Sequence, residues 1–201
     1  MRWRRYGEHA ALLDCASLAE MTAAHATVSA ARPDGVVELV PGARSLLVVA
    51  DARALEAVRK LLDGADLAHP PAGDSRAVSL DVRYDGEDLE LVARDAGLST
   101  EDVVELHTGA EYTVAFTGFA PGFGYLTGLP AELQQPRLET PRTRVPAGAL
   151  GVAGEFTGVY PRESPGGWRL LGHTSTTLFD PHATPPALLA PGDRVRFRSV
   201  R

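Results

Sequence analysis

Glycine and proline are concentrated in the second half of this chain, and they limit what that half can fold into. Twelve of the twenty glycines lie between residues 109 and 172, and seven of the fifteen prolines lie between residues 121 and 165. Neither suits a helix interior, because glycine loses the most backbone freedom on folding and proline lacks a backbone N–H. Short apolar runs such as YTVAF, GALGVAG and WRLLG lie between these turns. We therefore predict a compact all-β barrel or sandwich.

The densest part of this region is FTGFAPGFGYLTGLP, residues 116–130, which holds four glycines, two prolines and four aromatic residues. Glycine beside aromatic residues is typical of backbone that passes close to another strand or to a ligand. We predict that the segment enters as a barrel strand and then crosses the mouth of a pocket as a loop. Its glycines are expected to turn where a Cβ atom would clash, and its rings to face the pocket or a partner. In the simpler alternative, the rings fill the barrel and the glycines make tight corners.

The first seventy residues alternate between strand and helix patterns. Residues 2–15 predict a strand or hairpin, residues 16–32 a helix, and two β-rich runs then meet at Pro41-Gly42. In DARALEAVRKLLDG, Asp51 is a suitable N-cap and Gly64 a suitable end for an amphipathic helix. This order of elements predicts a ferredoxin-like α/β sandwich.

A break in the pattern follows at HPPAGDSR, residues 69–76, which is the best candidate for a linker. We therefore expect an N-terminal domain at 1–75 and a second domain at 76–201. After this break VSLDVRY predicts a strand, and two short helices follow. Ser99 and Asp102 can form a capping box at the second helix. His107 lies in its last turn, where the helix dipole favours a cationic imidazole.

Composition excludes several classes of protein and site. A net charge of −6 argues against nucleic-acid binding. One cysteine, Cys15, permits neither an intrachain disulfide nor a multi-thiolate metal centre, and no histidine pair has the spacing of a helical zinc site, so no metal site is expected. No apolar run is long enough to span a membrane and the start is not a signal peptide, so we expect a cytoplasmic protein. Lys60, the single lysine, stands in neither a P-loop nor a serine–lysine amidase context.

Three arginines, Arg137, Arg142 and Arg144, alternate with prolines within residues 136–146. Proline restricts the backbone between them, so their guanidinium groups can be held with little loss of entropy. Arginine held in this way suits carboxylates and phosphates through paired hydrogen bonds. We predict that at least one of the three recognises an anion. For any single arginine, a surface ion pair with a nearby glutamate is the simpler alternative.

Several long motifs occur in one order along the chain: YDGEDL, GFAPGFGYL, PRTRVPAG, TGVYP, SPGGW and LFDP. Together they resemble the B-subunit family of bacterial ATP-dependent 5-oxoprolinase, also labelled allophanate hydrolase subunit 1 or the Kip-type kinase inhibitor family. The resemblance implies an α+β fold, with a small N-terminal ferredoxin-like α/β domain followed by a C-terminal cyclophilin-like β-barrel domain.

The resemblance also implies an enzyme subunit that is inactive alone. Members pair with a C subunit, which is similar to allophanate hydrolase subunit 2, and act with an A subunit to hydrolyse 5-oxo-L-proline to L-glutamate at the expense of ATP. ATP is then a co-substrate, with Mg²⁺. Which subunit binds it stays open, and a partner subunit is one candidate for most of the binding. The chemistry activates the amide oxygen as a phosphate ester before water attacks, so it needs anion-stabilising donors more than a protein nucleophile.

Taken with the resemblance, the residues above give a candidate site. The expected catalytic residues are His107, Tyr125 and Arg144. The expected substrate-binding residues are Phe119, Phe123, Arg142, Tyr160, Trp168 and His173. The glycines expected to shape the backbone are Gly118, Gly122, Gly124, Gly148, Gly166 and Gly167.

Three positions depart from the family pattern. Phe156 stands where a glutamine is usual, Ala149 where a serine is usual, and His173 where an arginine is usual. A different substrate or a greater dependence on the partner would follow if these positions contact substrate. Two other functions stay open: a regulatory module that inhibits a sensor histidine kinase, and a subunit related to urea carboxylase or allophanate hydrolase.

Overall fold

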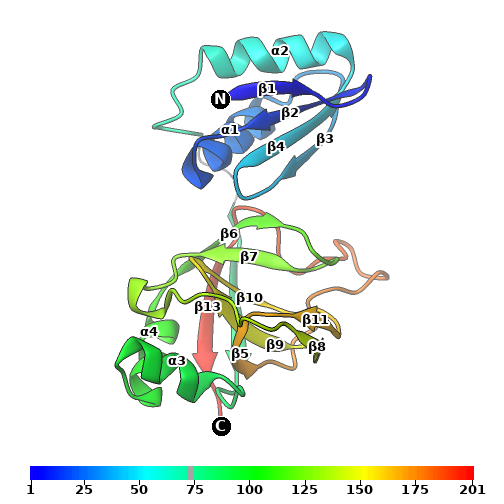
Figure 1. Cartoon of the computed structure of the whole chain (residues 1–201). Helices are drawn as coiled ribbons and strands as arrows, with labels where there is room; N and C mark the ends of the chain where they lie inside the picture. The colour runs from blue at the N-terminus through cyan, green and yellow to red at the C-terminus, as the bar shows by residue number, and fades with distance from the viewer. Residues whose placement is uncertain (72–74) are drawn as a thin grey trace. The chain divides into compact units, whose positions relative to one another are not determined.

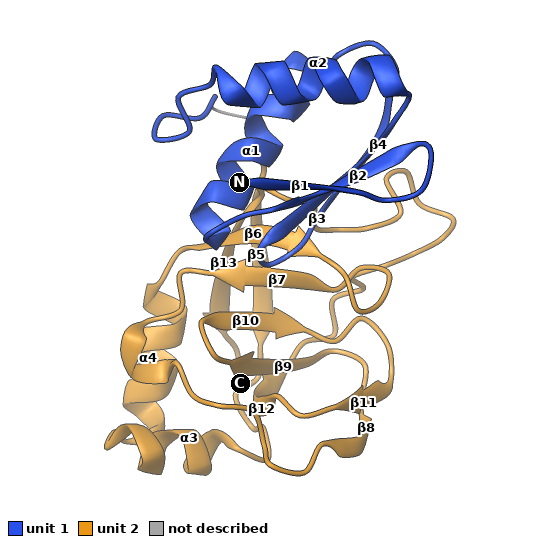
Figure 2. Cartoon of the chain, turned by 45° about the horizontal axis from the view of Figure 1, so that its top comes forward, with its two compact units in different colours: residues 1–74 blue, residues 75–201 orange. Residues whose placement is uncertain are grey.

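The computed structural model of the chain describes residues 1–71 and 75–201. Residues 72–74, part of the expected linker at 69–76, lie outside the described residues. The chain divides into two compact units, Met1–Asp74 and Ser75–Arg201, which Figure 2 shows in different colours. We describe each unit by itself.

Unit 1 is an antiparallel four-stranded sheet with two helices, and its strand order is β1-β2-β4-β3. Its elements are β1 (Arg2–Arg5), β2 (Ala10–Asp14), α1 (Leu18–Ala31), β3 (Val36–Pro41), β4 (Ser45–Ala50) and α2 (Ala52–Asp63) (Figure 1). Alternate residues of β4 are buried, and they share one core with Met21, Val28 and Val58 of the helices. Asp51 accepts a hydrogen bond from the backbone N–H of Ala54, and α2 ends at Gly64, as predicted. The expected ferredoxin-like sandwich is confirmed, with the N-terminal hairpin supplying its outer strand.

Unit 2 contains a seven-stranded sheet, in the order β12-β9-β10-β7-β6-β13-β5, and a separate β8–β11 pair. Its strands are β5 (Ala77–Val82), β6 (Tyr112–Thr117), β7 (Gly124–Thr127), β8 (Arg142–Val145), β9 (Ala149–Ala153), β10 (Phe156–Val159), β11 (Ser164–Gly166), β12 (Arg169–His173) and β13 (Arg194–Ser199). Its helices are α3 (Leu89–Ala96), α4 (Thr100–Gly109) and the 3-10 helix η1 (Ala131–Leu133). The capping box at Ser99 and Asp102 is confirmed.

The two edges of this sheet meet and nearly close a barrel. Arg83, just after β5, exchanges two backbone hydrogen bonds with His173 of β12, at 2.9 and 2.8 Å. A Cβ on Gly172 would lie 2.1 Å from the Arg83 carbonyl oxygen, so this approach requires glycine. The predicted barrel is therefore confirmed. Helices α3 and α4 lie at one side of it, and the β6–β7 turn and the β8–β11 pair lie at the other in both views (Figures 1 and 2).

Candidate functional site

The segment FTGFAPGFGYLTGLP forms the β6–β7 hairpin and its turn. The turn is tight, because the Gly118 N–H donates to the Phe123 carbonyl at 3.2 Å and the Ala120 N–H donates to the Gly118 carbonyl at 2.7 Å. Phe119 at its tip has a φ of +66° and is 57% exposed. A non-glycine residue in the left-handed region is strained by about 1 kcal/mol or more, and such strain is most frequent at functional sites.

The glycines expected to shape the backbone divide into two groups. A Cβ on Gly122, Gly148 or Gly166 would lie 2.7 Å or less from a neighbouring atom, so these three positions need glycine as predicted. At Gly118 and Gly124 the nearest atoms would lie 4.0 and 3.4 Å away, which is ordinary packing distance. Neither has a positive φ, so the expected clash at these two was wrong. At Gly167, expected only to shape the turn, the nearest atoms to a Cβ would lie 3.6 Å away.

Seven rings from the turn and the adjoining strands pack against one another, and we call them the aromatic cluster: Phe116, Phe119, Phe123, Tyr125, Phe156, Tyr160 and Trp168. Phe116 and Tyr125 are stacked with ring centroids 4.3 Å apart. Phe123, in contrast, meets Trp168 edge to face at 5.3 Å. Such contacts stabilise the cluster beyond simple burial of apolar area.

Only part of the aromatic cluster is open to a ligand. Phe123, Tyr160 and Trp168 are at most 5% exposed, so they support the cluster from within and their expected direct contact with substrate is not favoured. Tyr125 and Phe156 are half-buried and Phe119 is exposed. The surface that a substrate or partner can reach therefore comes from these three rings. A pocket of about 450 Å³ lies beside the turn, between residues 117–122 and residues 187–191.

The hydroxyl of Tyr160 lies in the supporting layer. Burial raises its pKa, while the backbone N–H of Trp168 and the positive charge of Arg137 act in the opposite direction. Tyr160 is therefore a neutral phenol at neutral pH, and it can donate a hydrogen bond but cannot act as a base.

Arg142 is held inside the unit by two acidic residues. Its Nη2 donates to Asp88 at 2.8 Å and its Nε donates to Glu87 at 3.2 Å. These contacts raise the pKa of Arg142, chiefly through the hydrogen bond to Asp88. Its Nη1 is buried without a hydrogen-bond partner in the described part of the chain. Arg142 is thus arranged as a structural cation, and the predicted contact with a substrate anion is not favoured.

Arg144 is placed differently, on the surface. Its side chain is 76% exposed and its Nε donates to Glu163 at 2.7 Å. This is the surface ion pair that the sequence offered as the simpler alternative. A catalytic role for Arg144 stays a prediction.

His107 is fully buried between two hydroxyl groups. Its Nε2 lies 3.1 Å from Thr157 Oγ1, and its Nδ1 lies 2.8 Å from the Tyr84 hydroxyl. Since the Thr157 hydroxyl donates to the Gly151 carbonyl, Nε2 must donate to Thr157 and Nδ1 must accept from Tyr84. Burial lowers the pKa of His107 to about 3. The cationic form that the helix dipole favours is therefore absent at neutral pH, because desolvation outweighs the dipole. A catalytic role for His107 stays a prediction.

Two of the three departures from the family pattern lie in or beside the aromatic cluster. The Phe156 ring meets Tyr125 edge to face at 5.7 Å, and Ala149 is buried beside the cluster. His173 is the register partner of Ala149 in the β9–β12 pair, and its Nδ1 lies 2.8 Å from Asp85. Two of the departures therefore make the cluster more apolar, while His173 faces an acidic group at the barrel seam.

The sequence did not single out the group that organises this region, Asp88. Besides binding Arg142, its carboxylate accepts from the backbone N–H of Leu170 at 2.7 Å. A buried aspartate in a turn gives no periodic pattern, and only its place in YDGEDL could have drawn attention to it. A second pairing was missed for the same reason: the buried Arg169 donates to the buried Gln135 and to the exposed Asp95.

The described residues offer neither a metal site nor a membrane span. Within residues 1–71 and 75–201, no group of three or more His, Cys, Asp or Glu side chains could hold a metal ion. Among the helices that the structure describes, none is both long and apolar enough to cross a membrane.

Comparison with known sequences gives a family. A family described as the carboxyltransferase domain, subdomain C and D, matches residues 1–189. The 5-oxoprolinase B subunit of Escherichia coli O157:H7 is 46% identical over 168 residues, which cover 81% of this chain and 77% of that protein. The 5-oxoprolinase B subunit of Bacillus subtilis (strain 168) is 40% identical over 180 residues, which cover 81% and 75% of the two chains.

Comparison with solved structures agrees with the fold. The crystal structure of the protein TTHA0988 matches with a TM-score of 0.79 at 40% identity over 96% of this chain. The chain spans only 40% of the length of that protein. The urea amidolyase of K. lactis matches 98% of this chain and 15% of its own length, with a TM-score of 0.72 at 19% identity, and this likeness concerns the fold alone.

Proposed function

We propose that this chain is the B subunit of an ATP-dependent 5-oxoprolinase. The chain belongs to the family described as the carboxyltransferase domain, subdomain C and D, and it is similar to proteins named as the B subunit of 5-oxoprolinase. The observation that carries the proposal is the identity of 46% to such a protein over 81% of this chain. The reaction converts 5-oxo-L-proline, ATP and two waters into L-glutamate, ADP and phosphate. The A and C subunits of the same complex are the proposed partners.

The aromatic cluster is the proposed contribution of this chain to the site. The five-membered lactam is a small ring with apolar faces, and the accessible faces of Phe119, Tyr125 and Phe156 suit such a ring. The Tyr125 hydroxyl can donate a hydrogen bond to the lactam or carboxylate oxygen. In this proposal the chain orients the substrate, while the buried layer of Phe123, Tyr160 and Trp168 keeps the exposed rings in place.

ATP does not fit the residues of this chain that the structure describes. Arg142 is occupied by Asp88 and Glu87, and Arg144 is on the surface with Glu163. The single lysine, Lys60, lies exposed on α2 beside Glu56. We therefore derive no step through ATP on this chain, and we propose that a partner subunit holds the nucleotide with its Mg²⁺. The isolated chain is accordingly expected to be inactive.

The test is reconstitution. The chain is purified alone and together with its partner subunits, and glutamate formation is measured with ATP and 5-oxoproline each present or omitted. Turnover that needs all subunits and both substrates supports the proposal. Turnover by the chain alone, or none by the assembled complex, contradicts it; a chain that instead inhibits a histidine kinase would be a regulator.

A single-atom change tests the role of the aromatic cluster. Tyr125→Phe keeps the ring and its packing and removes only the hydroxyl. We expect the complex to assemble normally and to lose about tenfold or more in turnover or substrate affinity, the usual scale for one lost hydrogen bond to substrate. Tyr6→Phe, at a tyrosine that is 62% exposed in unit 1, is the control. If both variants keep the kinetics of the unmodified complex, the Tyr125 side chain has only a packing role.

A further inference from the structure

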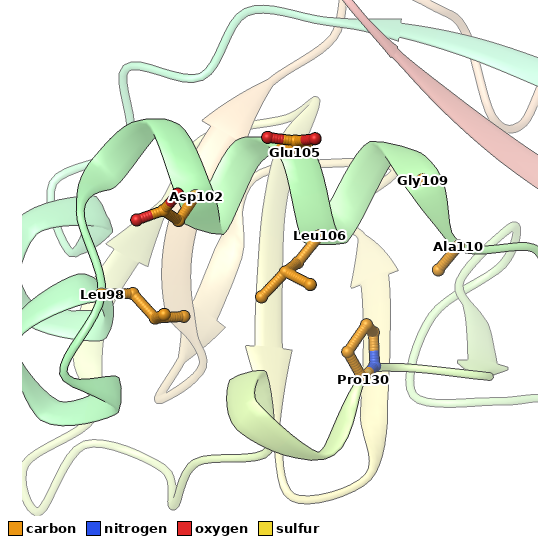
Figure 3. Close-up of a pocket in the computed structure, with 7 residues that line it drawn as sticks. All are labelled: Leu98, Asp102, Glu105, Leu106, Gly109, Ala110 and Pro130. Carbon is orange, nitrogen blue, oxygen red and sulfur yellow. The ribbon is translucent and has the colours of Figure 1, made fainter.

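Helix α4 presents a second hollow that the proposed site does not use. A pocket of about 660 Å³ is lined by Leu98, Asp102, Glu105, Leu106, Gly109, Ala110 and Pro130. Figure 3 shows Leu98, Leu106 and Pro130 facing a common space beside the helix. Except for Leu98 and Pro130, the lining follows positions i, i+3, i+4 and i+7 of α4 and then its C-cap residue Ala110, so it is one face of the helix together with its end.

Gly109 gives the most informative observation on this face. It stands in the last turn of α4 and has no positive φ, so its backbone conformation does not require glycine. A Cβ built there would meet no atom within 4 Å, so packing inside the chain does not require glycine either. In the middle of a helix glycine costs about 0.5–1 kcal/mol relative to alanine, and at this last residue of α4 the cost is smaller. Close packing of a partner molecule against this helix would explain why residue 109 is glycine.

The charges on this face are of one sign. Asp102 and Glu105 line its edge, and no arginine or lysine is among the seven lining residues. The Asp102 carboxylate is fixed by the Ser99 N–H at 3.1 Å and the Ser99 hydroxyl at 2.7 Å, so it does not turn away. An apolar floor bordered by two carboxylates is complementary to an apolar stripe bordered by lysine or arginine.

We infer that this α4 face is a docking site for a basic amphipathic helix of a partner subunit. Helices pack at interaxial distances of about 8–10 Å, and the shorter distances need small residues at the crossing, such as Gly109 and Ala110. The occupant places apolar side chains against Leu98, Leu106 and Pro130, and its basic residues meet Asp102 and Glu105. This inference rests on the proposed function only in taking the partner to be a member of that complex.

The experiment uses calorimetry to measure how tightly the full chain associates with the purified C subunit, the proposed pairing partner, at low and high salt. Glu105→Lys reverses one charge of the border, and we expect it to weaken association about tenfold, with a smaller salt dependence. Gly109→Gln projects a side chain towards the hollow from a position where a Cβ meets no atom within 4 Å, and we expect a loss of about tenfold or more. Glu101→Lys makes the same charge change on α4 outside the lining, and we expect it to stay within about threefold of the unmodified chain.

Four outcomes overturn the inference. In the first, Glu105→Lys and Gly109→Gln both associate normally; in the second, Glu101→Lys weakens association as much as they do. In the third, the unmodified chain does not associate; in the fourth, the chain is a homodimer that Gly109→Gln converts to a monomer. Circular dichroism and thermal melting of each variant verify that the fold is kept. Loss of association in the two variants, with no glutamate formed by the unmodified complex, would uphold the docking site and reject the proposed function. If either variant associates with normal affinity and its complex forms glutamate, the proposed function is upheld and the docking site is rejected.

Discussion

The two units of this chain bury very different kinds of side chain. In unit 1, Thr27 is the one buried polar residue among those the structure describes, and the rest of the core is aliphatic or small. Unit 2 buries seven polar or charged residues: Asp88, His107, Gln135, Thr157, Arg169, Thr174 and Asp193. Several of these bond to partners 34 to 82 residues away in the chain. Unit 1 is thus stabilised mainly by apolar contact, and unit 2 also depends on specific polar pairs.

This difference indicates which substitutions should most lower the stability of each unit. Shortening a side chain in an apolar core loses its packing and leaves a cavity, whereas removing one partner of a buried polar pair leaves the other partner unsatisfied. Each unit contains one tryptophan, Trp3 in unit 1 and Trp168 in unit 2. Trp3→Phe and Trp168→Phe backgrounds therefore allow the unfolding of each unit to be followed separately by fluorescence.

The largest effect is expected at Asp88. Asp88→Ala leaves Arg142 and the Leu170 N–H without their buried acceptor, and we expect it to lower the free energy of unfolding of unit 2 by about 3–5 kcal/mol. Urea unfolding followed through Trp168 measures this, and the transition of unit 1 should not move. Glu87→Ala, which removes the exposed partner of Arg142, is the control and should cost less than about 1 kcal/mol. A small effect of Asp88→Ala would show that the polar pairs of unit 2 are not essential.

The next effect depends on pH and comes from His107. Its pKa is about 3 in the folded chain and 6.5 ordinarily, so below pH 6.5 the unfolded chain takes up a proton that the folded chain excludes. The free energy of unfolding of unit 2 therefore falls as the pH falls from 6.5 towards 3, by on the order of 1 kcal/mol per pH unit from this group. In His107→Gln this pH dependence is absent. Measuring the free energy of unfolding of the variant and of the unmodified chain from about pH 4 to 8 shows the difference. Parallel pH profiles would mean that His107 has the same pKa in the folded and the unfolded chain, which contradicts the lowered pKa.

In unit 1 a smaller effect is expected at the N-cap of α2. Asp51→Ala removes the acceptor of the Ala54 N–H, whose hydrogen bond is 2.8 Å long. We expect a loss of about 1 kcal/mol, the usual effect of replacing an N-cap aspartate by alanine. Unfolding followed through Trp3 measures it. A loss as large as that of Asp88→Ala would abolish the contrast between the units.

The smallest effect is expected at Arg144. Its ion pair with Glu163 joins side chains that are 76% and 52% exposed, so Arg144→Lys should change the stability of unit 2 by less than about 0.5 kcal/mol. The same variant in the reconstituted complex tests the catalytic prediction. Unchanged stability with a large loss of turnover would show that Arg144 contacts substrate or a partner there. Unchanged turnover would leave it as a surface ion pair.

The sequence predicted those features of the fold that depend on residues close together in the chain. The cap at Asp51, the capping box at Ser99 and Asp102, and the hairpin at Pro41-Gly42 depend on residues a few positions apart, and the structure contains all three. Burial of His107 and the pairing of Arg142 with Asp88 depend on which distant strands meet, and no periodic pattern encodes that. The glycine-rich stretch illustrates the limit: composition predicted a turn, but it did not distinguish Gly122, where a Cβ would clash, from Gly118, where it would not.

The pairing of β5 with β13 has a mechanical consequence. The two strands run parallel over six residue pairs, from Ala77 with Arg194 to Val82 with Ser199. Residue 75 therefore lies near one end of this ladder and residue 201 near the other, and a pull on the two ends loads all six pairs in shear. Bonds loaded together must break together, so unit 2 should resist stretching along this axis far more than its equilibrium stability suggests. Pulling single molecules between residues 75 and 201, and then between 75 and 194, would measure the difference, because the second geometry opens the ladder one pair at a time.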